Sequence, residues 1–132
     1  MDSSTANGNG PQAAGAPFTV GLDDAGLLRL TWARDLDITQ PLAEYAMAAV
    51  DELCGDDRHP MLVDMATTAS VTRQARGVFA KPCAASAIAL LGASPVDRVI
   101  ANFVLGVSSL PCPTKYFTSE PAALRWLGDV RD

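Results

Sequence analysis

Apolar residues alternate with polar or small ones in the first patterned part of the chain. They stand on both sides of the stretch DDAG, at Phe18, Val20, Leu22, Leu28, Leu30 and Trp32. A period of two residues is typical of half-buried strands, and a short turn between two such runs indicates a hairpin. The pattern therefore predicts an antiparallel β-hairpin over residues 18–32.

Helical spacing then predicts two helices in the first half of the chain. The longer one follows Thr39, has Pro41 in its first turn and ends at Gly55. A hydroxyl residue before the helix, Pro at its start and Gly at its end are the expected boundary signals. The shorter helix covers the stretch VTRQARGVF, residues 71–79, whose apolar residues share one face.

Two more helices are predicted in the second half. Ser94 as N-cap, Pro95 at the first position and Asp97 three residues after the cap open a long apolar helix over residues 95–108. A closing helix over residues 119–127 begins at a serine cap. The apolar face of the helix over 95–108, predicted to be buried, comprises Val96, Val99, Ile100, Phe103, Val104 and Val107.

Three further strands separate these helices, at residues 61–65, 85–93 and 114–117. The middle one, ASAIALLGA, is almost entirely apolar, as is typical of a strand covered on both faces. Strands that alternate with helices give a mostly parallel sheet with helices packed on it. The sequence thus predicts an α/β fold with a mostly parallel central sheet, an N-terminal antiparallel hairpin and about four helices.

This order of elements resembles the STAS family, the sulfate transporter and anti-sigma factor antagonist domains. The strand MLVDM leading into a loop and short helix looks like the family's switch segment. The ending KYFTSEPAALRWL is similar to its last strand and helix. The resemblance covers residues 17–130 and implies a non-enzymatic regulatory or protein-interaction module.

Family antagonists carry an Asp-Ser pair at the start of the short helix, where a kinase partner phosphorylates the serine. Here Ser70 stands in the place of the aspartate and Thr72 near that of the serine, so the pair itself is missing. Arg73 and Arg76 replace residues that are usually small or apolar. This departure puts a standard phosphorylation switch in doubt.

Composition narrows the choice of function. The net charge is −5, whereas a nucleic-acid-binding face must be basic to neutralise phosphates, so nucleic-acid binding is disfavoured. Three widely spaced cysteines are expected to be reduced thiols in a cytoplasmic protein. No apolar run approaches the roughly 20 residues of a membrane span. Residues 1–16 hold too few large apolar side chains to fold, which predicts a flexible tail before a single domain over residues 17–132.

The loop-helix segment 67–76 is the candidate site. Parallel sheets place ligands beyond the carboxyl ends of their strands, and this segment directly follows one. Hydroxyls and two arginines on one helical face suit a protein partner or a small anionic ligand. The residues assigned to this site are Thr68, Ser70, Thr72, Arg73 and Arg76.

Ser70 and Thr72 allow two interpretations. In the structural one, Ser70 caps the following helix through its hydroxyl. In the functional one, Ser70 or Thr72 is phosphorylated at the helix start and the arginines stabilise the phosphate. Arg73 and Arg76, likewise, are either solvated surface residues or the contacts of an anion.

Two alternatives come from the apolar stretches. The helix over 95–108 is apolar on nearly every side, so an exposed side would favour a homodimer through it, and the other interpretation is a deep core helix. The same excess of apolar residues also suits a small carrier for an apolar, lipid-like ligand. An enzyme ranks last, because Asp64 and His59 have no catalytic or metal-ligating partner at a recognisable spacing. No cofactor or metal is expected.

Overall fold

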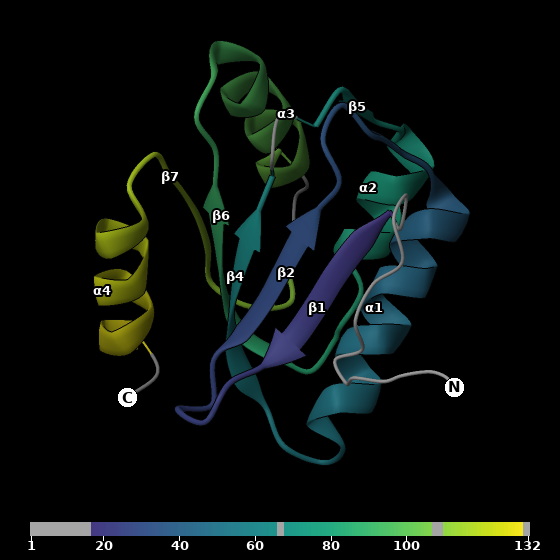
Figure 1. Cartoon of the computed structure of the whole chain (residues 1–132). Coiled ribbons are helices and arrows are strands. Elements are labelled where there is room, and N and C mark those ends of the chain that lie inside the picture. The colour runs from purple at the N-terminus through teal and green to yellow at the C-terminus, as the bar shows by residue number, and fades with distance from the viewer. Residues whose placement is uncertain (1–16, 66–67, 107–109, 131–132) are drawn as a thin grey trace, which may run out of the picture.

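A five-stranded sheet with the strand order β1-β2-β4-β6-β7 forms the centre of the domain (Figure 1). The computed structural model describes residues 17–65, 68–106 and 110–130. β1 and β2 form the antiparallel hairpin, with Phe18 opposite Trp32, and every later strand is parallel to its neighbour. The strands are β1 (Phe18–Leu22), β2 (Leu28–Trp32), β4 (His59–Asp64), β6 (Ala85–Leu91) and β7 (Thr114–Phe117).

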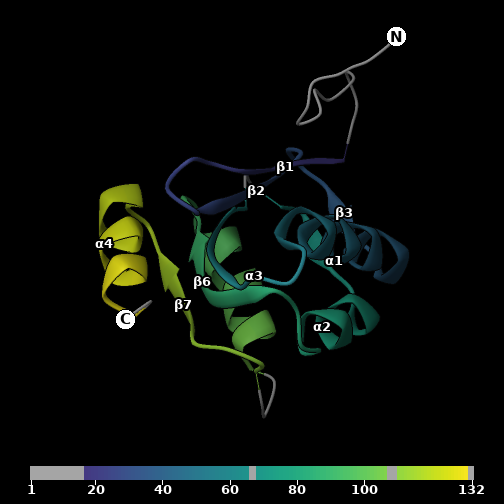
Figure 2. The ribbon, with the colours of Figure 1, turned by 90° about the horizontal axis from the view of Figure 1, so that it is seen from below.

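The described residues form four helices, which cover the two faces of the sheet unequally. α1 (Gln40–Cys54), α2 (Arg73–Phe79) and α3 (Pro95–Leu105) lie on one face, and α4 (Glu120–Val130) lies on the other (Figure 2). The first three helices each connect one parallel strand to the next, and the sheet grows in one direction along the chain. Right-handed crossovers then place all three connecting helices on the same face. α4 follows the last strand and is free of this constraint.

Each face of the sheet has its own apolar core, because alternate residues of a strand point to opposite faces. Leu30, Met61 and Val63 belong to the larger core under α1, α2 and α3. Leu62, between the last two in sequence, packs with Leu127 of α4 in the smaller core.

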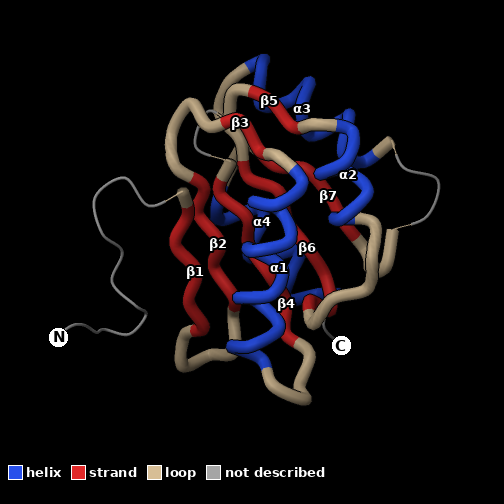
Figure 3. The backbone as a smooth tube through the Cα atoms, turned by 90° about the vertical axis from the view of Figure 1, so that its right-hand side faces the viewer, coloured by secondary structure: helices blue, strands red, loops and turns tan. Residues whose placement is uncertain are grey.

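A second, two-stranded sheet lies beside the carboxyl ends of the main strands (Figure 3). β3 (Asp37–Ile38) and β5 (Ser70–Val71) pair in parallel, with Asp37 opposite Ser70. This short ladder holds the chain after β4 against the chain after β2. It therefore anchors the segment from which α2 begins.

The predicted fold class is confirmed, with the hairpin, the mostly parallel sheet and four helices. Several boundaries differ. The strands predicted at 61–65 and 85–93 are His59–Asp64 and Ala85–Leu91, and the closing helix predicted at 119–127 is Glu120–Val130. The short helix begins at Arg73 and not at Val71, because residues 70 and 71 are engaged in β5. The apolar helix ends at Leu105, and residues 107 and 108 of the prediction lie outside the described residues. The predicted tail, residues 1–16, also lies outside them and stays a prediction.

Candidate interaction site

The predicted site residues separate into two groups. Thr68 is 1% exposed, and its hydroxyl donates to the Met65 carbonyl oxygen at 2.5 Å. It lines an internal cavity and does not reach the surface. Ser70 and Arg73, by contrast, are exposed, and Thr67 lies outside the described residues. The surface part of the candidate site is therefore smaller than the sequence suggested.

Ser70 does not cap α2, so the structural interpretation of this serine is wrong. Its hydroxyl donates to Asp37 Oδ1 at 2.6 Å, which ties β5 to β3 through side chains as well as backbone. The N-cap is Thr72, whose Oγ1 accepts from the Ala75 amide at 3.0 Å. The cause is the β3–β5 ladder, which keeps residues 70 and 71 extended and delays the first helical turn by two residues.

The two arginines of α2 have different surroundings. Arg73 is exposed and makes no ion pair within the described part of the chain. The guanidinium carbon of Arg76 lies 4.4 Å from the centre of the Phe103 ring, and its Nη1 donates to the Phe103 carbonyl oxygen at 3.2 Å. Arg76 therefore joins α2 to α3, and its charge has no carboxylate partner among the residues that the structure describes.

α3 turns an apolar stripe toward solvent, which corrects the predicted burial of this helix. Val96 is 55% exposed and Val99 is 67% exposed. The buried side consists of Asp97, Ile100 and Ala101. Of the other predicted core positions, Phe103 and Val104 are half-buried and Val107 lies outside the described residues.

Asp97 explains why α3 is rotated in this way. Its Oδ2 accepts from the amides of Ala93, at 2.9 Å, and of Ser94, while the Ser94 hydroxyl accepts from the Asp97 amide. This capping box holds the carboxylate against the polypeptide just before the helix, on the side that faces the sheet. With Asp97 inward, Val96 and Val99 are directed outward.

Five residues of α2 and α3 are grouped here as the α2–α3 surface, namely Arg73, Arg76, Val96, Val99 and Phe103. Positions 96, 99 and 103 follow helical spacing and share one side of α3. Phe103 contacts Arg76, and Arg73 lies one turn before Arg76 on α2. The surface thus combines exposed aliphatic side chains with two cations in a chain whose net charge is −5.

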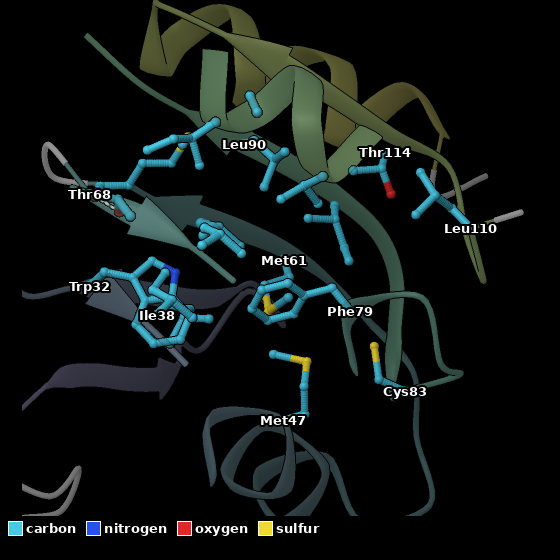
Figure 4. A pocket seen from close by; sticks show the side chains of 18 residues that line it. Trp32, Ile38, Met47, Met61, Thr68, Phe79, Cys83, Leu90, Leu110 and Thr114 are labelled. Carbon is cyan, nitrogen blue, oxygen red and sulfur yellow. Dashed lines mark hydrogen bonds between the residues drawn. The ribbon is translucent and has the colours of Figure 1, made fainter. Parts of the chain in front are cut away.

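Behind α3 lies a cavity of about 60 Å³ between the sheet and helices α1, α2 and α3 (Figure 4). Its lining is apolar apart from a few hydroxyl, thiol and indole groups. An engineered apolar cavity of about 150 Å³ binds one benzene molecule. The volume here is well below that needed for a lipid chain, so the lipid-carrier alternative gains no support from the cavity as it stands.

The three cysteines, far apart in sequence, lie at the end of α1 and two residues before β6 and β7, and Cys83 is near enough to interact electrostatically with both others. Burial raises the pKa of the Cys54, Cys83 and Cys112 thiols, and the neighbouring Cys83 raises the pKa of the other two further. A raised pKa keeps a thiol protonated and poorly nucleophilic at neutral pH. The cysteines therefore offer no activated nucleophile, and all three are free thiols.

No catalytic constellation emerges elsewhere in residues 17–65, 68–106 and 110–130. His59 lies at the start of β4, where its Nδ1 is 3.1 Å from the Gly26 carbonyl oxygen of the hairpin turn. Within the same residues, no group of three or more His, Cys, Asp or Glu side chains could hold a metal ion. None of the described helices is long and apolar enough to span a membrane.

Comparison with known proteins places the chain in a family. The model of a family described as a domain of unknown function, DUF7793, matches residues 22–131. The chain belongs to this family. A protein of unknown function from Arthrobacter sp. FB24 shares 65% identity with this DUF7793 chain, over 83% of it and 97% of the other chain, with a TM-score of 0.35. No curated protein matches.

A second solved structure bears on the fold. It is an uncharacterised protein of the DUF3478 family from Shewanella loihica PV-4, described as having a SpoIIAA-like fold. It covers 89% of the DUF7793 chain and 99% of its own, at 18% identity and a TM-score of 0.56. The STAS-like fold expected from the sequence is thereby confirmed.

Proposed function

We propose that this DUF7793 domain is a non-enzymatic regulatory module that binds a protein partner through the α2–α3 surface. The observation that carries the proposal is the pair Val96 and Val99, 55% and 67% exposed and one turn apart on α3. Val99 lies about one turn before Phe103 on the same side of α3, and the Phe103 ring contacts Arg76 of α2. Interfaces combine an apolar centre with polar residues at the rim, and Arg is enriched in them.

The charges on this surface suggest the chemistry of the partner. Within the described residues, Arg73 makes no ion pair, and the Arg76 guanidinium contacts an aromatic ring and a carbonyl oxygen, neither of which carries a negative charge. A guanidinium forms strong paired hydrogen bonds with a carboxylate or phosphate. The partner that fits is therefore a protein with a small apolar patch beside acidic or phosphorylated side chains.

The hydroxyls of the segment suggest how binding would be regulated. Phosphorylation of the exposed Ser70 would set a charge near −2 against Asp37, in place of the present hydrogen bond. Like-charge repulsion would open the β3–β5 contact and displace the start of α2, with Arg73. Thr72 is the other predicted switch residue, and its Oγ1 is already engaged as the N-cap.

Site-specific photocrosslinking tests the proposal. A benzophenone amino acid is placed at Val99 and, as the matched control, at the exposed Arg125 of α4, on the other face of the sheet. We expect one protein to be crosslinked from position 99 only, and the crosslink to weaken when Arg73→Glu is added. Equal products from both positions, or none in cells that express the native gene, would contradict the proposal.

The same experiment separates a partner from a second copy of the chain. The homodimer predicted through residues 95–108 would give a crosslinked species of twice the chain mass, 13.8 kDa for one chain. Sedimentation of the Val99→Asp variant then shows whether that dimer depends on α3. A dimer retained in Val99→Asp would exclude α3 as its interface.

A further inference from the structure

The cavity behind α3 has an apolar lining and lies apart from the α2–α3 surface. Its lining comes from β2, β4, β6 and β7 of the main sheet, from the short strands β3 and β5, and from all three helices on this face, and it includes no charged side chain. In Figure 4, the half-buried Cys83, Leu110 and Thr114 lie at one end, while Trp32, Ile38 and the buried Thr68 lie at the other. The cavity therefore runs along the sheet toward a partly open end.

Its two hydroxyl groups are already used. The Thr68 hydroxyl donates to the Met65 carbonyl oxygen, and the Thr114 hydroxyl donates to the Cys112 carbonyl oxygen at 3.1 Å. A charged or strongly polar ligand would lose its hydration here without gaining partners in return. The lining thus selects an uncharged, apolar molecule.

The volume of the cavity limits the size of the molecule that can enter. About 60 Å³ is less than half the cavity of about 150 Å³ that holds benzene. A ligand the size of one aromatic ring therefore requires the walls to move. Met47, Met61 and Met65 line the cavity, and unbranched methionine side chains adapt readily to irregular spaces.

Among the elements that line the cavity, α3 is the one best able to move. It contributes Ile100, Ala101 and Val104 to the lining, and its far side faces solvent, so nothing in the described chain supports it from behind. Arg76 provides its polar link to α2, through one carbonyl hydrogen bond and the Phe103 ring. A small outward shift of the part of α3 that carries Ile100, Ala101 and Val104 would enlarge the cavity while Asp97 keeps the start of the helix in place.

We propose that the cavity between the sheet and α1–α3 binds a small uncharged apolar molecule about the size of one aromatic ring, with α3 as its movable wall. This site is separate from the α2–α3 surface and does not depend on the proposed function. The proposal is tested on the full chain with benzene and toluene as probes. Benzoate is the matched control, because it has the same ring with a negative charge.

Methyl NMR of 13C-labelled methionine gives the readout at the site itself. Signals of the three lining methionines, assigned with Met→Leu variants, should shift and saturate with benzene or toluene and remain unchanged with benzoate. Saturating probe should also raise the midpoint of thermal unfolding by about 3 °C, because a ligand of the native state stabilises it. Unshifted methionine signals at saturating probe would overturn the proposal.

Two positions of α3 supply matched variants. Val104 lines the cavity, whereas Val99 faces solvent on the same helix. Val104→Phe should fill the space and weaken benzene binding by about tenfold or more, while Val99→Phe should leave it unchanged. Val104→Ala removes two methyl groups from the wall and should tighten binding, so the test holds even where the larger side chain prevents folding. Equal affinity in wild type, Val104→Phe and Val104→Ala would place the binding elsewhere and overturn the proposal.

Discussion

Substitution of two glycines by alanine should change stability in opposite directions. Gly92 is buried directly after β6, and a Cβ built there would lie 2.6 Å from Tyr116 Oη, 2.7 Å from Asp97 Cβ and 2.8 Å from Tyr116 Cε1. Carbon atoms in good contact are about 3.5–4.0 Å apart, so the neighbours would have to move by about 1 Å. Gly128, on α4, has nothing within 4 Å of the added atom.

The surroundings of Gly92 cannot move freely. Its amide donates to the Phe117 carbonyl oxygen at 3.0 Å, which fixes the backbone at the edge of the sheet. Asp97 is held by the capping box, and the Tyr116 ring has the Arg98 guanidinium 5.0 Å from its centre on one side. Overpacking in such sites costs about 1–3 kcal/mol, and three contacts below 3.0 Å put Gly92→Ala near the upper end.

The expected changes in the free energy of unfolding combine the packing cost with the effect of alanine on the unfolded chain and on the helix. Alanine restricts the unfolded chain and recovers about 0.5–1 kcal/mol, so Gly92→Ala should lower the free energy of unfolding by about 2 kcal/mol. Gly128→Ala should raise it by about 0.5–1 kcal/mol, because alanine is the better helix former. With a urea m-value of about 1.5 kcal/mol/M, the unfolding midpoint falls by about 1.3 M in the first variant.

Urea unfolding followed by circular dichroism measures both values, and a double variant tests the cause. Tyr116 Oη is buried without a hydrogen-bond partner in the described chain, so Tyr116→Phe alone should be close to neutral. In combination, it should restore part of the loss in Gly92→Ala by removing the nearest contact. A Gly92→Ala protein as stable as the wild type, or no coupling with Tyr116→Phe, would refute this explanation of the packing.

Two further predictions concern the α3 cap and the buried thiols. Ser94→Ala removes the reciprocal cap of α3 and should lower the free energy of unfolding in urea by about 1 kcal/mol. Ser119→Ala is the control and should cost less, because it loses only an exposed hydrogen bond of 3.4 Å. Equal losses in the two variants would contradict the assigned caps. The free energy of unfolding should fall as the pH rises above about 9. Burial raises the pKa of the thiols in the folded chain, so they ionise first in the unfolded one. The stabilisation by the protonated thiols is therefore fully present at neutral pH and is lost as the pH passes through the folded pKa values. A urea midpoint that stays constant between about pH 8 and about pH 10.5 would contradict this explanation. As a control, the fall of the midpoint with pH should be smaller when serine replaces Cys54, Cys83 and Cys112.

Local patterns were sufficient for most of the architecture. Alternation around the DDAG turn predicted the hairpin, and the serine, proline and aspartate at positions 94, 95 and 97 predicted the capping box that the structure contains. Both rest on interactions between residues close in sequence. The family resemblance then led to the STAS-like fold, which the comparison with a SpoIIAA-like structure confirmed.

The site depended on contacts that no local pattern encodes. Ser70 resembled a helix cap until pairing with Asp37, 33 residues earlier in the chain, placed it in β5. Thr68 resembled a surface hydroxyl, yet the turn after β4 directs it into the interior. The position of Ser70 is decided by a residue on another strand, and that of Thr68 by the course of the backbone after β4. Local sequence preferences specify neither of them.

The sequence by itself determined the five main strands, the four helices, their order and the capping box of α3, because these follow from the period of apolar residues and from short-range hydrogen bonds. Tertiary structure decided which side of α3 faces solvent, since a helix that is apolar on nearly every side has no face of its own to bury. It also gathered the three cysteines and left a cavity behind α3. Such features depend on how side chains of distant elements fill a common space, and that space exists only in the folded chain.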